Sequence, residues 1–151
     1  MQCTPHAIRT RRAVLAVSQR ELAKRSSVKQ PLLSAIESGK RLPTASVSKA
    51  IEEHLQVRPS AVLAFYRQQV RDKVGAHRGK CVSIFGSVAR GTDTVDSDLD
   101  LLVEFEEGTD ICDLLALEEE LSELLTVPVD VVSAGSQSDF VQGIRSEAVP
   151  L

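Results

Sequence analysis

Aromatic residues are scarce in this chain: four Phe, one Tyr and no Trp make up 3% of its 151 residues. A hydrophobic core must therefore be built from Leu, Ile, Val and Ala, which favours helices and short strands over a large β-sandwich. No apolar run approaches the roughly 18–20 residues that cross a bilayer, and the first residues lack the apolar stretch of a signal peptide. These absences argue against a membrane or secreted protein and predict a cytoplasmic one.

Cysteine and histidine are also few, with three of each. Three is an odd number of cysteines, and no pair has the Cys-x-x-Cys spacing of a zinc or redox motif. No histidine lies at a metal-ligand spacing from another histidine or cysteine. The sequence therefore predicts free thiols in a reducing compartment and no zinc site built from these residues.

Charge is divided unequally along the chain, although the net charge is only −3. Residues 1–80 hold 16 Lys and Arg against 5 Asp and Glu, a net charge of +11, whereas residues 81–151 hold 2 against 16, a net charge of −14. Such a division indicates two modules with different partners. The basic half suits phosphate backbones, and the acidic half suits cations or a basic protein.

The first half has the pattern of several short helices. Thr4 and Pro5 are a good N-cap and first residue for one helix, and Ser18 with Glu21 reads as a capping box for the next. Leu32, Leu33 and Ile36 place an apolar face on a third helix. The expected helices lie near residues 5–15, 18–26, 29–37, 47–55 and 61–74. Short helices joined by tight turns are what a helix-turn-helix requires.

Many residues of this half resemble, at fixed spacing, the Cro and phage repressor (XRE) family of helix-turn-helix proteins. The resemblance covers about residues 6–63 and departs from the family at Ser27, where glycine is frequent, and at Pro31 in the third helix. The residues that carry it are Ser18-Gln19, Glu21-Leu22-Ala23, Val28, Gln30, Ser34, Ile36-Glu37, Gly39-Lys40-Arg41 and Pro43.

The third helix of such a module lies in the major groove of DNA, where glutamine can recognise adenine. The predicted DNA-binding residues are Gln19, Lys29, Gln30, Ser34, Lys40 and Arg41. We expect a homodimer on a double-stranded operator. The alternative is a helical docking module that no longer binds DNA, because Ala35 leaves a groove-facing position without a large side chain.

The second half predicts three short strands, near residues 80–85, 98–105 and 127–132, with a long amphipathic helix over residues 110–125 and a terminal helix. Asp98 and Asp100 point to the same face of one strand because side chains alternate along a strand. Asp130, on an adjacent strand, can supply a third carboxylate to the same point. Three such carboxylates can hold two Mg²⁺ ions for phosphoryl chemistry, so we expect all three to be catalytic and metal ligands.

A phosphate-binding turn is predicted just before these carboxylates. Gly86 lets the backbone approach a phosphate closely, and Ser87 offers a hydroxyl at the start of a helical turn. Arg90 lies one turn later and is one of only two positive charges in the acidic half, which makes it a candidate phosphate clamp. We expect these three residues to bind the nucleotide.

The sequence Gly86-Ser87, ten residues, then Asp98-x-Asp100 resembles the signature of the DNA polymerase β-like nucleotidyltransferases. The stretch from Phe85 to Phe105 is similar in particular to the minimal nucleotidyltransferases of the MntA type, over about residues 78–151. Members of that group are antitoxins that silence a HEPN-family RNase toxin by transferring AMP from ATP to a tyrosine. The resemblance therefore implies a Mg²⁺-dependent protein adenylyltransferase with ATP as substrate and a HEPN-type toxin as partner.

Together these observations predict an α+β protein, an all-α helix-turn-helix domain followed by a small α/β domain with a short mixed sheet. The expected domains are residues 1–68 and 79–151, with a linker or helix over 69–78. Because no acceptor-binding domain follows the third carboxylate, we expect another molecule to bring the acceptor. DNA binding would then regulate the operon. The alternatives are a transcriptional regulator whose nucleotidyltransferase fold senses nucleotide or only binds the partner, an inactive relative, and a small-molecule transferase.

Overall fold

The chain divides into two compact units, Met1–Val57 and Arg58–Leu151. The computed structural model describes residues 3–135 and 139–151. We expected the first domain to extend to residue 68, but the structure assigns the helix that begins at Pro59 to the second unit. This helix packs against a strand and a helix of that unit, and Val70 and Val74 on it are buried. None of the described helices is long and apolar enough to cross a membrane.

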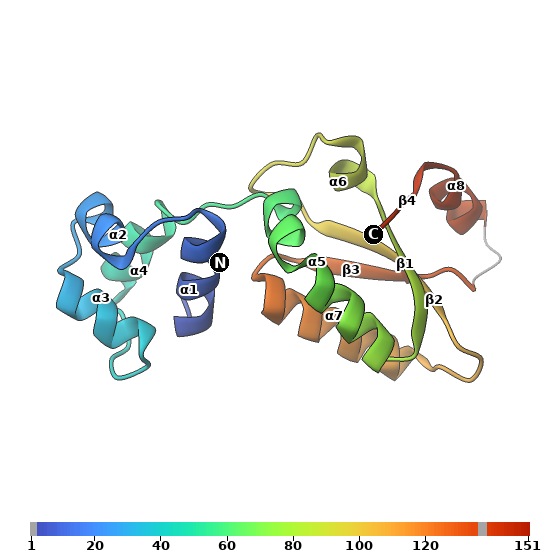
Figure 1. Cartoon of the computed structure of the whole chain (residues 1–151), viewed down its shortest axis with the longest axis horizontal. Helices are drawn as coiled ribbons and strands as arrows, with labels where there is room; N and C mark the ends of the chain where they lie inside the picture. Colours follow the sequence, from blue (N-terminus) through green and yellow to red (C-terminus); the bar gives the residue numbers. More distant parts are fainter. Residues whose placement is uncertain (1–2, 136–138) are drawn as a thin grey trace. The chain divides into compact units, whose positions relative to one another are not determined.

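The first unit is a group of short helices around an aliphatic core. Its helices are α1 (Pro5–Val14), α2 (Gln19–Ser26), α3 (Gln30–Glu37) and α4 (Ala45–Glu52), shown in blue and cyan in Figure 1. Ile8, Leu22, Leu33, Ile36, Ile51 and Leu55 are fully buried in this core. The expected all-aliphatic helical domain is confirmed.

Side-chain caps explain where these helices begin. The hydroxyl of Thr4 accepts the backbone N–H of Ala7 at 3.1 Å, and the hydroxyl of Ser18 accepts the N–H of Glu21 at 3.1 Å. Only half of the predicted capping box is present, because the Glu21 carboxylate instead pairs with Arg25 at 2.8 Å, one turn further on. An oppositely charged neighbour at this spacing competes successfully for an exposed carboxylate.

The second unit is a mixed four-stranded sheet with helices on both faces. Its elements are α5 (Pro59–Ala76), β1 (Gly79–Phe85), α6 (Gly86–Arg90), β2 (Leu99–Phe105), α7 (Ile111–Leu125), β3 (Val129–Ser133), α8 (Asp139–Glu147) and β4 (Val149–Pro150). The strand order is β3-β2-β1-β4, with β2 parallel to β3 and β1 antiparallel to both of its neighbours. The expected α+β class with a mixed sheet is confirmed. The sequence did not predict β4, a two-residue strand that contains proline.

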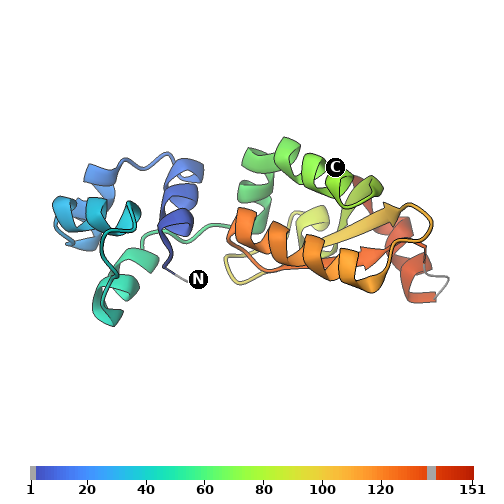
Figure 2. The ribbon, with the colours of Figure 1, turned by 90° about the horizontal axis from the view of Figure 1, so that it is seen from below.

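The two faces of the sheet carry different residues. Figures 1 and 2 show α5 and α7 side by side, and these helices cover the face that contains the buried Leu101 and Val103. On the other face, Val141 and Ile144 of α8 pack against Leu102. Asp100 shares this second face with Leu102, because residues two apart on a strand point the same way. The start of β2 and β3 on this face is therefore where the predicted carboxylates lie.

Candidate active site

The predicted carboxylates come together because β2 and β3 are parallel neighbours in register. Asp100 and Asp130 are directly paired across the two strands, and Asp98 lies two residues before Asp100. Asp100 is half-buried, whereas Asp98 and Asp130 are exposed. Since paired residues share a face of the sheet, the three carboxylates lie on one side of it.

Strand β3 is held in this register by helix α7 on its outer edge. The N–H of Val129 donates to the hydroxyl of Ser122 at 3.1 Å, and the N–H of Val131 donates to the carboxylate of Glu118 at 3.0 Å. These two bonds flank Asp130 in the chain. They give partners to two backbone N–H groups on the outer edge of β3 that would otherwise have none in the sheet. They also fix the face of the sheet on which Asp130 lies.

The electrostatics of the site are those of crowded negative charge. Burial, followed by the charges of Asp130 and Asp98, raises the pKa of the Asp100 carboxyl above its ordinary value. Arg90 acts in the opposite direction and lowers this pKa. Its charge offsets only part of the effect, so the group as a whole attracts a cation.

The donor chemistry of this group fits Mg²⁺, which prefers carboxylate oxygens. Within residues 3–135 and 139–151, however, no three His, Cys, Asp or Glu side chains are arranged closely enough to enclose a metal ion. Neighbouring carboxylates repel one another unless a cation lies between them. The assignment of Asp98, Asp100 and Asp130 as metal ligands therefore stays a prediction.

The predicted phosphate-binding turn directly contacts the carboxylate site. Gly86 begins α6 with a φ of +66°, and a Cβ atom at this position would lie 2.1 Å from Oδ2 of Asp100. Glycine is needed here both for the left-handed backbone and for the close approach to Asp100. Ser87 follows, and its carbonyl accepts the N–H of Thr92 at 2.9 Å, so the chain folds back after α6.

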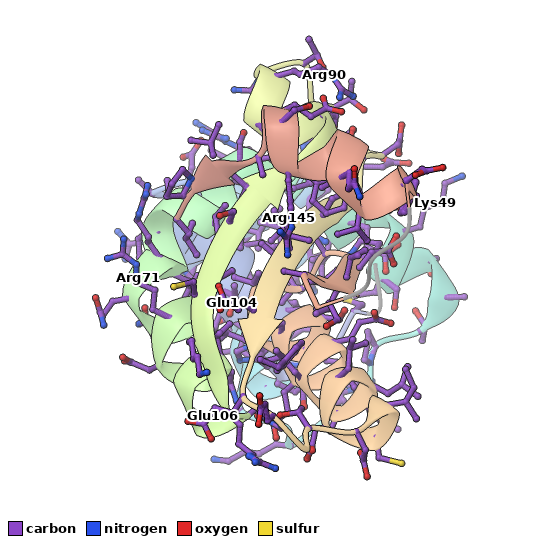
Figure 3. All side chains as sticks on the ribbon, turned by 90° about the vertical axis from the view of Figure 1, so that its right-hand side faces the viewer. Lys49, Arg71, Arg90, Glu104, Glu106 and Arg145 are labelled. Atoms are coloured by element: carbon purple, nitrogen blue, oxygen red, sulfur yellow. The ribbon has the colours of Figure 1, made fainter. Side chains whose placement is uncertain are left out.

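Arg90 has a partner that the sequence did not reveal. Its Nη1 lies 3.1 Å from Oε2 of Glu147, at the end of α8, and both side chains are more than half exposed. Figure 3 shows Arg90 at one end of the unit and Arg145 over the face of the sheet, where Arg145 donates to the carbonyl of Ala134. An exposed pair of this kind is weak, so Arg90 can exchange Glu147 for a phosphate.

The predicted DNA-binding residues lie on or next to α2 and α3. Five of them are exposed, namely Lys29, Gln30, Ser34, Lys40 and Arg41. Gln30 is at the first position of α3, where a recognition helix meets the base edges, and Gly39 ends this helix with a φ of +72°. The chain then presents Lys40 and Arg41.

Gln19 is engaged within the unit. Its side-chain oxygen accepts from Gln30 at 2.9 Å, and its side-chain nitrogen donates to Glu37 at 3.1 Å. Glu37 is 5% exposed and also accepts two bonds from Arg12, at 2.7 and 3.0 Å. Gln19 thus connects Gln30 to the buried ion pair of Arg12 and Glu37 and orients the Gln30 side chain. The sequence alone did not indicate this role.

The fold and the carboxylate group define a nucleotidyltransferase-like unit behind a helix-turn-helix unit, and comparison with known proteins agrees. Residues 65–149 match the nucleotidyltransferase domain family, and residues 8–62 match a helix-turn-helix family. The chain belongs to the nucleotidyltransferase family and carries an XRE-type helix-turn-helix domain at its front.

Individual relatives match mainly the second unit. The protein adenylyltransferase MntA of Thermococcus cleftensis is 36% identical over 59% of this chain and 88% of its own length. A solved structure, provisionally described as a minimal nucleotidyltransferase, is 42% identical over 61% of this chain and 95% of that chain, with a TM-score of 0.55. A toxin–antitoxin crystal structure with AMP-PNP is 22% identical over 54% of this chain and 68% of that chain, with a TM-score of 0.50, which shows the fold alone.

Proposed function

We propose that this protein transfers AMP from ATP to a hydroxyl group of a partner protein. The observation that carries the proposal is the in-register pairing of Asp100 with Asp130 beside the Gly86 turn. Family membership supports nucleotidyl transfer, and the relative from Thermococcus cleftensis is named a protein adenylyltransferase. The residues required for this chemistry, namely the carboxylates, a phosphate-binding turn and one arginine, lie on adjoining elements.

In this reaction the acceptor oxygen forms a bond to the α-phosphorus of ATP, the bond from that phosphorus to the β-phosphate bridge breaks, and pyrophosphate leaves. Asp130 is exposed and accepts the proton of the attacking hydroxyl as general base. Ser87 and Arg90 hold the departing phosphates. Mg²⁺ held by the three carboxylates would supply charge neutralisation at the phosphates.

A basic protein is the partner that best fits the charge of the second unit. Residues 58–151 contain 17 Asp and Glu against 8 Lys and Arg, a net charge of −9. Complementary charge speeds association and orients the partner. The family resemblance names the class: a HEPN-type toxin that receives AMP on a tyrosine, with this protein as its antitoxin.

The test combines the purified protein, ATP and Mg²⁺ with the product of the neighbouring gene, whose mass is then measured. The partner should gain one or more AMP groups, about 329 Da each. Asp130→Asn should abolish the gain of mass. Asp96→Asn, which changes an exposed carboxylate in the loop between α6 and β2, should not. A stable complex with an unmodified partner would instead support neutralisation by binding alone.

We also propose that the first unit binds an operator and regulates its own operon. Residues 1–57 carry 10 Lys and Arg against 4 Asp and Glu, a net charge of +6, which suits a phosphate backbone. Gln30→Ala should cost about 1–3 kcal/mol on the cognate site and relax base preference there, whereas Lys40→Ala should weaken all sequences alike. Titrations with cognate and random duplexes compare the two, and equal losses for Gln30→Ala would remove it from base recognition.

A further inference from the structure

The loop between α6 and β2 contains a buried carboxylate that the proposed reaction does not use. Asp93 is 5% exposed, although it lies in a polar loop among exposed neighbours. Its Oδ2 accepts the backbone N–H of Ser60 at 2.9 Å. A carboxylate is buried at a cost unless hydrogen bonds compensate it, so this bond is a specific feature of the fold.

The bond completes the start of helix α5. Arg58 is at the N-cap position with the extended backbone of a cap, φ −85° and ψ 146°, but makes no side-chain capping bond, and Pro59 follows it. The first turn of a helix has N–H groups without partners inside the helix, and these favour an anionic acceptor. Asp93 therefore caps α5 from a distance of 33 residues along the chain.

The same residue lies between the two halves of the candidate active site. On one side, the N–H of Thr92 bonds to Ser87 at 2.9 Å, which ties the loop to the phosphate-binding turn. On the other side, the N–H of Thr94 donates to the hydroxyl of Ser97 at 2.9 Å, directly before Asp98. Asp93 is thus the point at which this loop is attached to the helical layer.

We propose that Asp93 is a positioning residue for the candidate active site. Its bond to Ser60 holds the loop so that the phosphate-binding turn and Asp98 keep a constant separation, without Asp93 touching the reacting atoms. This inference rests on the proposed function, because it concerns the same site. It predicts a role that a simple helix cap would not have, namely control of the loop and of metal binding at the carboxylates.

Three variants, with the single Arg58→Ser variant as a control, separate positioning from capping. Asp93→Ala removes the bond and should lower the melting temperature by about 2–4 °C. Asp93→Asn keeps an acceptor oxygen and should have the melting temperature of the parent. Arg58→Ser combined with Asp93→Ala places a new local cap on α5 and should restore the melting temperature without restoring the loop.

Two measurements on the full chain read out the loop without requiring transferase activity. Amide hydrogen exchange of the peptide over residues 91–99 should be about fivefold faster or more in Asp93→Ala and in the double variant. Calorimetry with Mg²⁺ alone should show weaker binding in the same two variants. Asp93→Asn and the single Arg58→Ser variant should match the parent in both measurements.

The outcomes are distinguishable. A double variant that regains the melting temperature but keeps the faster exchange supports positioning. A double variant that returns to parental exchange and Mg²⁺ affinity, or an Asp93→Ala variant with unchanged loop exchange, overturns it. If the parent transfers no AMP, the proposed function fails, and the loop exchange still decides whether Asp93 fixes the loop.

Discussion

Replacing Gly86 with alanine adds a single methyl group at the contact between the phosphate-binding turn and the carboxylate site. The added Cβ would lie 2.1 Å from Oδ2 and 3.0 Å from Cγ of Asp100. The Gly86 backbone is held between β1 and α6, so the Asp100 side chain must move away by about 1 Å to reach ordinary contact. The movement displaces the carboxylate of Asp100, the residue that lies opposite Asp130 in the strand register.

The expected cost has two parts. A non-glycine residue in the left-handed region costs about 1–2 kcal/mol, and forcing Asp100 off its rotamer costs about 0.5–1.5 kcal/mol more. The total of about 1.5–3.5 kcal/mol should lower the melting temperature by about 3–14 °C in a chain of this size. Gly91 offers a matched control: its φ is +70°, and a Cβ there would meet nothing within 4 Å. Gly91→Ala should therefore show only the backbone cost.

The assay measures melting temperature with and without Mg²⁺, and AMP transfer, for both variants. Gly86→Ala should lose the Mg²⁺-dependent rise in melting temperature and most of the transfer, whereas Gly91→Ala should keep both at a lower stability. Equal losses in the two variants would show that backbone strain, and not the collision with Asp100, explains the need for glycine. Full activity of Gly86→Ala would refute the assignment of the site.

Other predictions concern pH, the buried ion pair and the turn before α3. Because the pKa of Asp100 is raised in the folded chain, its contribution to stability is present at low pH and is lost as the pH rises through that raised value. Asp100→Asn should therefore make the melting temperature in EDTA less dependent on pH above the ordinary pKa of an aspartate, and an unchanged pH profile would contradict this. Glu37→Ala leaves the half-buried Arg12 without its partner and should cost about 3–5 kcal/mol in urea unfolding of the first unit, whereas a loss below about 1 kcal/mol would show the pair to be dispensable. Ser27 has a φ of +57°, so Ser27→Gly should raise the melting temperature slightly, and a decrease would show that its side chain is needed.

Much of the architecture was predictable because it depends on residues close together in sequence. Caps at Thr4 and Ser18, and the glycine after α3, act over three or four residues, so composition and spacing reveal them. The common face of Asp98 and Asp100 follows from alternation along one strand. Asp130 lies on a short apolar segment that follows a helix, which is the pattern of a strand next to β2. The structure shows that this strand, β3, is parallel to β2.

The sequence alone therefore determined the identity of most elements, the two-residue strand β4 excepted, and the set of side chains on each of their faces. Only the tertiary structure decided which distant groups meet: Asp93 with the N–H of Ser60, Arg90 with Glu147, and the packing that assigns α5 to the second unit. These contacts span dozens of residues and have no local period. They form because packing of the sheet and helices buries some groups and leaves some backbone N–H groups without partners, and these groups then bond to whatever lies near them. Which groups become buried or unpartnered cannot be read from neighbouring residues in the sequence.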